Sequence, residues 1–251
     1  MAYGDRELVR GNKGADVKEL QMRLAGFRGT VPDGEFGPGT ELQVQSFQRD
    51  WMQLLNPTGR VDGDTFAALD DFARLHPISF DTLRCPCGIC SGFGQEKFKG
   101  SYRSGMPKAE AFYRYEYPGI HRMVLWAFRA ALFYCHQQDM DLIITSGYRC
   151  SEDNKQQGRT STNHHGKAVD FDIVGTRDKR EDMKVCDEVR GMLVETANAQ
   201  VGWSASNRKS LEPNNIAPTW VHYDVRSYER TYLTDQYFVR DLEALNGISA
   251  E

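Results

Sequence analysis

The chain of 251 residues lacks long apolar runs, an excess of basic residues and a large number of cysteines. No apolar run approaches the roughly 18 to 20 residues of a transmembrane helix, which argues against membrane insertion. Lys and Arg total 31 against 35 Asp and Glu, so the broad basic surface of a nucleic-acid-binding protein is not expected. Six cysteines are too few for a disulfide scaffold. The remaining possibility is a globular protein with one large or two small domains.

The first residues, Met1 to Glu7, do not contain the apolar segment of a secretory signal. We therefore expect synthesis in the cytoplasm without a signal peptide. Any action outside the cytoplasm would then require another export route.

Three short segments between residues 8 and 72 carry apolar side chains at helical spacing. These side chains are Val17, Leu20 and Leu24, then Val44, Phe47, Trp51 and Leu55, and finally Phe66, Leu69 and Phe72. Asp-Gly turns at Asp33 and Asp62 separate the segments, and each aspartate is expected to bind the backbone of its own loop. The pattern predicts a three-helix domain over residues 1–75.

This segment resembles the peptidoglycan-binding module found on many cell-wall hydrolases. The matching motifs are Leu8-Val9-Arg10-Gly11, Asp16-Val17-Lys18-Glu19-Leu20-Gln21, Asp33-Gly34-Glu35-Phe36-Gly37, Phe47-Gln48 and Val61-Asp62-Gly63-Asp64-Thr65. The resemblance implies a three-helix anchor that binds peptidoglycan and has no catalysis of its own.

The remainder divides into an irregular, cysteine-containing connector over residues 76–117 and a second domain over residues 118–251. We expect the connector to pack on that domain. A long amphipathic helix after Pro118-Gly119, an apolar strand at residues 142–144 and a second helix at about residues 180–198 indicate an α+β fold. We predict a small, mainly antiparallel sheet with helices.

Two predicted strands carry histidine and aspartate on one face. Asp170 and Asp172 share a face of the first strand, while Trp220, His222 and Asp224 share a face of the second. The other face of each strand is apolar and can pack into the core. Two such faces side by side are a simple way to build a metal site.

A catalytic zinc ion usually takes three His or carboxylate ligands and keeps one position for water, whose pKa falls to about 7. His164, Asp170 and His222 would supply these three ligands. Gly166 permits the tight turn that brings His164 back toward Asp170.

These residues resemble the LAS-type zinc peptidases, the group of lysostaphin, D-Ala-D-Ala metallopeptidases and the hedgehog fold, in the D-Ala-D-Ala metallopeptidase branch. The matching motifs are Ser146-Gly147-Tyr148-Arg149, Gly166-Lys167-Ala168-Val169-Asp170 and Trp220-Val221-His222. Asn163 occupies the usual position of the first histidine, so the resemblance implies a shortened loop with His164 as ligand. His165 with Asp172 is the alternative register.

The resemblance leaves the general base open, because many relatives carry an acid three residues before the last histidine, where this chain has Thr219. The candidates, in order, are Glu212, Asp224 and His165. A loop carboxylate such as Glu212 can reach over the site, although either carboxylate can instead orient a metal ligand.

The resemblance also assigns one side chain to the substrate. It implies that Arg149 is a catalytic residue that binds a substrate carboxylate or carbonyl, for which its planar donor group is suited. Trp220 is expected to line the substrate cleft.

A cluster of cysteines raises the question of a second metal. Cys85, Cys87 and Cys90 lie close in sequence, and Cys150 follows the Ser-Gly-Tyr-Arg motif. Because the Cys-x-Cys-x-x-Cys spacing is not that of a standard zinc finger, we favour reduced or disulfide-bonded structural cysteines over a second, structural ion.

Together the two resemblances imply a monomeric, zinc-dependent peptidoglycan endopeptidase that cleaves stem peptides with metal-activated water. The bond would be L-Ala-D-Glu or D-Ala-diaminopimelate. We expect a phage endolysin that acts in the periplasm or cell wall, while a bacterial wall-remodelling enzyme or an exported effector peptidase fits the same sequence. The alternative is a zinc-containing wall-binding protein without turnover, suggested by Asn163 and Thr219.

Overall fold

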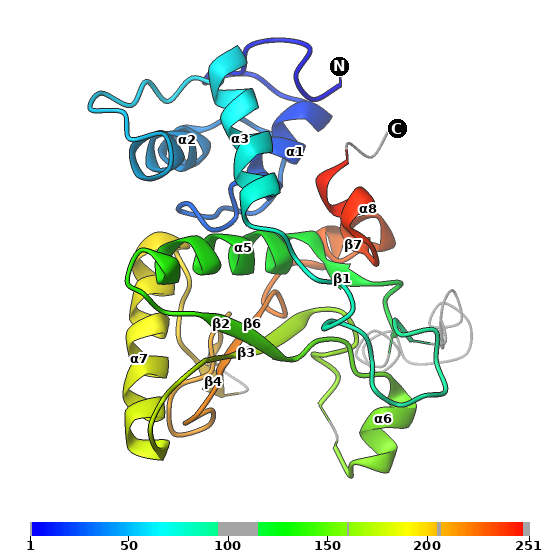
Figure 1. The fold of residues 1–251 in the computed structure, drawn as a ribbon. Helices are drawn as coiled ribbons and strands as arrows, with labels where there is room; N and C mark the ends of the chain where they lie inside the picture. Colours follow the sequence, from blue (N-terminus) through cyan, green and yellow to red (C-terminus); the bar gives the residue numbers. More distant parts are fainter. Residues whose placement is uncertain (1, 95–114, 160, 205–206, 248–251) are drawn as a thin grey trace.

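The computed structural model describes residues 2–94, 115–159, 161–204 and 207–247. Most of the second half of the predicted connector, residues 95–114, lies outside them. Helices form the N-terminal part, and a small sheet with flanking helices forms the rest (Figure 1). The predicted α+β fold is confirmed.

The N-terminal part contains the three predicted helices, α1 (Ala15–Arg23), α2 (Pro38–Asp50) and α3 (Gly63–Leu75). Asp62 caps α3, because its carboxylate accepts hydrogen bonds from the amide and hydroxyl of Thr65 at 2.9 and 2.8 Å. The predicted role of this Asp-Gly turn is therefore confirmed.

The second helix is shorter than its apolar spacing predicts. It ends at Asp50 instead of continuing to Leu55, whose side chain is 97% exposed. Gln53 adopts a positive φ of 56°, which a continuing α-helix cannot accommodate. The backbone turn therefore removes Leu55 from the apolar face that the sequence suggested.

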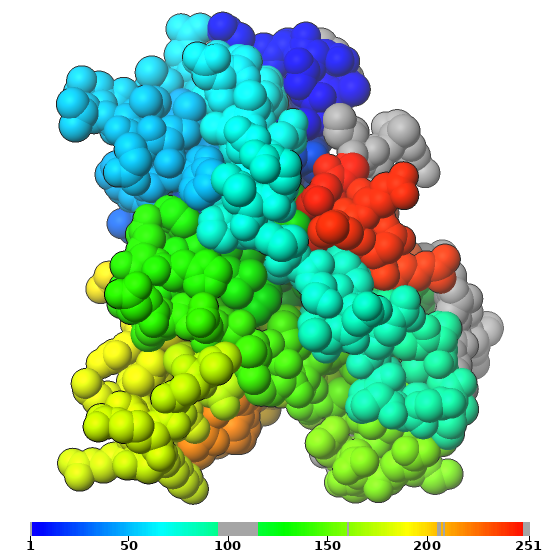
Figure 2. Space-filling view, viewed as in Figure 1, coloured from blue at the N-terminus to red at the C-terminus, as the bar shows by residue number. Residues whose placement is uncertain are grey.

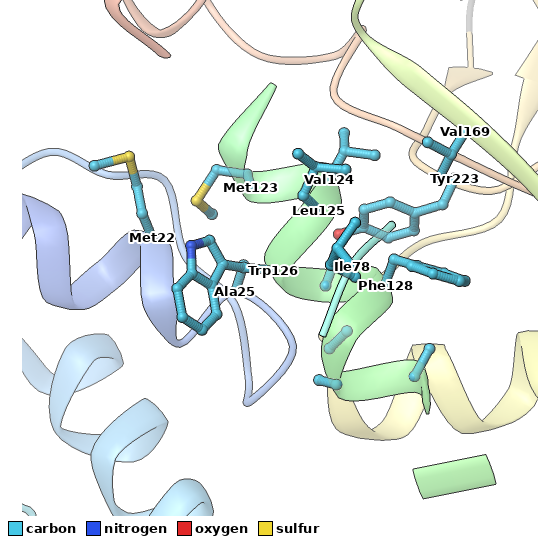
Figure 3. Close-up of a cluster of buried hydrophobic side chains, with 14 of the residues drawn as sticks. Met22, Ala25, Ile78, Met123, Val124, Leu125, Trp126, Phe128, Val169 and Tyr223 are labelled. Atoms are coloured by element: carbon cyan, nitrogen blue, oxygen red, sulfur yellow. The ribbon is translucent and has the colours of Figure 1, made fainter. Parts of the chain in front are cut away.

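Helix α5 (Arg122–His136) lies between the N-terminal helices and the sheet, and almost its entire length is buried. Figure 3 shows Trp126 on the side that faces Met22, and Phe128 on the opposite side near Tyr223. A helix that is apolar on all sides is expected in such a position. One continuous core therefore joins both halves of the molecule.

The central sheet has the strand order β2-β3-β6 and is antiparallel throughout, as predicted. Its strands are β2 (Leu142–Ser146), β3 (Ala168–Ile173) and β6 (Val221–Asp224). Asp170 of β3 lies directly opposite His222 of β6 in the register. Helix α7 (Lys179–Thr196), the second predicted helix, contacts β3, β6 and α5.

Shorter elements complete the fold. They are β1 (Ile120–His121), α6 (Ser151–Gln156), β4 (Trp203–Ser204), β5 (Asn207–Arg208), η2 (Arg230–Tyr232), η3 (Asp235–Tyr237), β7 (Phe238–Val239) and α8 (Leu242–Asn246). β1 pairs with β7, and α8 returns to the N-terminal helices, as the red atoms beside the blue and cyan ones show (Figure 2). None of the helices in the described ranges is both long and apolar enough for a membrane span.

A buried ion cluster fixes the N-terminal helices on α5. Both carboxylate oxygens of Glu19 accept hydrogen bonds from Arg122, at 2.6 and 2.7 Å, and one also accepts from Arg23 at 2.9 Å. All three side chains are almost completely buried. Since Glu19 lies in α1 and Arg122 in α5, this cluster links the predicted anchor to the predicted peptidase domain.

Glu19→Ala is expected to lower the free energy of unfolding by about 3–5 kcal/mol, because it removes the carboxylate that pairs with the buried guanidinium group of Arg122 and leaves Arg23 with Asp70 alone. Urea denaturation measures this change. The matched control is Glu35→Ala, which removes an exposed ion pair with Lys13 and should cost less than about 1 kcal/mol. Equal, small effects of the two substitutions would refute the role of the cluster.

Candidate functional site

The structure brings His164, Asp170 and His222 together at one point. Asp170 Oδ1 lies 3.2 Å from His164 Nε2 and 2.6 Å from His222 Nδ1. One ligand atom from each residue lies within 4.8 Å of the others, and all three side chains are buried. Two imidazole nitrogens and one carboxylate oxygen are the donor set typical of a catalytic zinc site.

The second nitrogen of each imidazole has its own partner. His164 Nδ1 lies 2.7 Å from the carbonyl oxygen of Gly147, and His222 Nε2 lies 2.8 Å from Asp224 Oδ2. Such contacts fix the orientation of metal-binding histidines and leave the other nitrogen for the metal. The arrangement therefore fits a divalent ion held by His164 Nε2, Asp170 and His222 Nδ1.

The loop between the first two of these residues is as short as its sequence suggests. Gly166 has a φ of +109°, and a Cβ atom there would lie 2.4 Å from the carbonyl oxygen of Gly119. The amide of Lys167 donates to Asn163 at 2.9 Å and closes the turn. A residue other than glycine would disturb this turn, and with it the position of His164.

His165 and Asp172, the alternative pair of ligands, do not lie together in the structure. His165 is buried on Asn154, whose side-chain nitrogen lies 3.3 Å from His165 Nε2. Asp172 groups instead with Asp182 and Cys186. The geometry therefore favours His164 with Asp170 over His165 with Asp172.

The ionisable groups of the site shift the pKa values of their neighbours. Burial alone would raise the pKa of Asp170, but the facing imidazoles of His164 and His222 hold it well below its usual range. Burial alone would lower the pKa of His222, but the carboxylates of Asp170 and Asp224 raise it to about 10. Asp170 is therefore ionised at neutral pH, as a metal-binding carboxylate must be, while His222 carries a proton that a bound metal ion displaces.

These residues line a cavity of about 530 Å³. The other lining residues are Thr145, Ser146, Arg149, Arg159, Ser161, Asp172, Trp203, Glu212, Thr219 and Trp220. Arg149 donates to the second oxygen of Asp170 at 2.7 Å and to Ser146 at 2.6 Å. The cavity thus places Arg149 and Trp220, both predicted substrate-binding residues, beside the three predicted metal ligands.

The two predicted carboxylate bases occupy different environments. Glu212 lines the cavity, with Oε1 4.0 Å from His222 Nε2, and burial raises its pKa. Asp224 has no exposed surface, accepts a hydrogen bond from His222 and forms an ion pair with Arg226 at 3.1 Å. Glu212 therefore faces the cavity, whereas Asp224 is buried against His222.

Comparison with known proteins finds two family matches in separate segments of the chain. Residues 13–69 match the family "Putative peptidoglycan binding domain", and residues 120–201 match the family "Peptidase M15". The chain carries a peptidoglycan-binding domain and a peptidase M15 domain. The resemblances stated from the sequence are thus confirmed. The M15 match includes His164 and Asp170 and ends before Glu212 and His222.

A curated relative is the zinc D-Ala-D-Ala carboxypeptidase of Streptomyces albus G. It is 47% identical over 45 residues, a match of 16% of this chain and 18% of the relative. The chain therefore matches less than a fifth of this relative's length.

The sequence reasoning missed Arg190, which supports the cavity wall of the M15 domain from α7. This buried side chain donates to the carbonyl oxygens of Glu212 at 3.1 Å and Trp220 at 2.6 Å, and also to that of Ala217. It thereby holds both ends of the loop that carries Glu212 into the site. The available signal was an arginine on the apolar face of a predicted helix, four residues after Cys186.

If this cavity hydrolyses peptides, Arg190→Leu is expected to leave metal binding by His164, Asp170 and His222 unchanged but to lower kcat by about 10- to 100-fold, because the loop of Glu212 loses its fixed position. Steady-state kinetics on soluble stem peptides, with metal analysis, measures both effects. Arg177→Leu, at an exposed position two residues before the same helix, is the control and should change neither quantity. Wild-type kcat in Arg190→Leu would contradict the supporting role.

Proposed function

We propose that this chain is a zinc-dependent peptidase that cleaves the peptide stems of peptidoglycan while residues 13–69 hold it on the wall. The observation that carries the proposal is the convergence of His164, Asp170 and His222 in one cavity, with the first two in the segment that matches peptidase M15. The peptidoglycan-binding match supports the same substrate.

The donor set suits zinc. Imidazole nitrogen and carboxylate oxygen are ordinary zinc ligands, and three of them leave one position for water or substrate. When bound, Zn²⁺ supplies a Lewis acid that polarises the scissile carbonyl group and lowers the pKa of a water molecule.

The residues around the ligands have separate roles in this proposal. Glu212 accepts the proton of the attacking water molecule and later delivers it to the leaving amine, a role suited to a carboxylate whose pKa is raised by burial. Arg149 binds a carboxylate or carbonyl oxygen of the peptide. Asp224 orients His222, and Trp220 contributes an apolar wall of the cleft.

The anchor and the active site are connected rigidly. The Glu19–Arg122 ion pair and the shared core fix the peptidoglycan-binding domain on α5. Attachment to the wall then raises the local concentration of stem peptides around the cavity, provided that the fixed geometry allows both contacts at once. The substrate therefore reaches the site as part of the polymer to which the anchor is bound.

The bond cleaved is L-Ala-D-Glu or the D-Ala-diaminopimelate cross-link in this proposal, because the metal site suits either and the cavity shape selects between them. The pairing of a wall-binding domain with a peptidase also fits an endolysin. Lysis of cells that express the chain together with a membrane-permeabilising protein tests the endolysin role.

The experiment that tests the function is mass spectrometry of purified peptidoglycan after incubation with the chain. We expect new peptide termini that disappear with a chelator and return when zinc is added, and their masses identify the bond. Zinc-loaded protein that sediments with the wall but leaves every stem intact would refute the peptidase and favour the wall-binding alternative.

A further inference from the structure

Four cysteine sulfurs gather about a second point, formed by segments far apart in the sequence. The Sγ atoms of Cys85, Cys87, Cys90 and Cys150 all lie within 4.8 Å of one another, and those of Cys87 and Cys150 are 3.6 Å apart. All four are free thiols in the structure. A zinc ion with Zn–S distances of about 2.3 Å places its sulfur ligands about 3.8 Å apart, so this spacing fits one central ion.

Backbone amides point at each of the four sulfurs. Cys87 Sγ accepts hydrogen bonds from the amides of Ile89 and Cys90, both at 3.3 Å. Cys90 accepts from the amide of Gly92 at 3.3 Å. Such donors stabilise negative charge on sulfur, which metal-bound thiolates carry.

The other two sulfurs are held in the same way. Cys85 accepts from the amide of Cys150 at 3.3 Å, and Cys150 accepts from the amide of Asp153 at 3.4 Å in the first turn of α6. The left-handed φ of +69° at Gly88 allows the turn that brings Cys87 and Cys90 together. If all four sulfurs ionise, their mutual repulsion at these distances requires a cation among them, which is the charge that a bound metal ion supplies.

We propose that Cys85, Cys87, Cys90 and Cys150 bind a structural zinc ion, separate from the His164, Asp170 and His222 site. Thiolate is a soft ligand that selects zinc over magnesium, calcium or manganese. Four protein ligands fill the tetrahedral shell and leave no open position, which is characteristic of structural sites. The sequence analysis favoured structural cysteines without a metal ion. In the structure, Cys150 joins the three closely spaced cysteines and completes a set of four sulfur ligands.

The proposed ion also bears on the active site, because Cys150 directly follows Arg149. Nearby contacts hold the same segment: the amide of Tyr148 donates to the carbonyl oxygen of Leu83 at 2.8 Å, and that of Ser151 donates to Glu116 at 2.6 Å. An ion at the four sulfurs therefore fastens the connector to the segment that carries Arg149. Its binding free energy contributes to folding of this region.

The test is zinc stoichiometry of the full chain, purified under reducing conditions and measured by inductively coupled plasma mass spectrometry. We expect two zinc ions per chain in the wild type, one in His222→Ala and one in Cys87→Ser. Cys135→Ser changes a buried thiol outside the cluster and should keep both. One ion in the wild type that is lost entirely in His222→Ala would overturn the proposal.

Cobalt substitution in the His222→Ala chain gives a second measurement that requires no cysteine variant to fold. We expect intense sulfur-to-cobalt charge-transfer bands in the near ultraviolet, because thiolates remain the ligands. Absence of these bands, together with disulfides in non-reducing mass spectrometry or four freely titrating thiols, would also overturn it. These readouts do not involve peptidase activity, so the structural ion and the proposed function can fail separately.

Discussion

Replacement of His222 by alanine is expected to lower kcat/KM for peptidoglycan stems by at least about 1000-fold, a loss of about 4 kcal/mol of transition-state stabilisation. Asp170→Ala should have the same effect. Each substitution removes one of three groups that meet within 4.8 Å, and the two that remain are one fewer than the three protein ligands of a catalytic zinc site. Zinc at this site should fall in parallel, while sedimentation with the wall should be unchanged because residues 13–69 lie elsewhere.

The control for this prediction is the adjacent histidine. His165→Ala changes a ring that contacts Asn154 and does not line the cavity, so zinc binding at the site and activity should survive. Activity retained by His222→Ala would refute the site. Loss of zinc in His165→Ala, with zinc retained in His164→Ala, would shift the first ligand to the alternative register.

Glu212→Gln should keep zinc and lose about 100- to 10,000-fold in kcat, the range expected when a positioned general base is removed. The amide has nearly the same shape and cannot accept the proton. KM should change little, because the three metal ligands and Arg149 remain in place. Metal analysis combined with steady-state kinetics on a soluble stem peptide measures these quantities.

Asp224→Asn is the matched comparison and should give a different result. Asp224 is buried against His222 and Arg226, so its substitution should weaken zinc affinity by about 10- to 100-fold through the orientation of His222. Excess zinc should then restore most of the activity. If Asp224→Asn keeps zinc and loses turnover while Glu212→Gln remains active, the proposed roles of the two carboxylates are reversed.

The local pattern of the sequence predicted the elements that carry the candidate ligands. Alternating polarity placed Asp170 and His222 on equivalent faces of two strands, and the structure pairs them directly in an antiparallel register. Alternating polarity predicts which face of a strand a side chain occupies, but not which residues pair across two strands. The sequence alone therefore could not predict that Asp170 and His222 lie next to each other. The position of Gly166 predicted the turn before β3, because few other residues adopt its φ.

Long-range partners could not be predicted in this way. The sequence analysis named Cys150 together with Cys85, Cys87 and Cys90, but Cys150 lies 60 residues beyond Cys90, and only the fold shows that the four sulfurs meet. Arginine is usually a surface residue, but Arg190 is buried. Its backbone acceptors lie in a loop, where no periodic pattern predicts them. The Glu19–Arg122 pair likewise depends on how two domains pack, which no local pattern records.

The most direct test of the central claim is a crystal structure of the full chain with data collected on both sides of the zinc absorption edge. We predict an anomalous peak within ordinary coordination distance of His164 Nε2, Asp170 and His222 Nδ1, with Glu212 facing the open side. No zinc peak at these atoms in zinc-supplemented crystals, with His222 still bridging Asp170 and Asp224, would contradict a metallopeptidase site here.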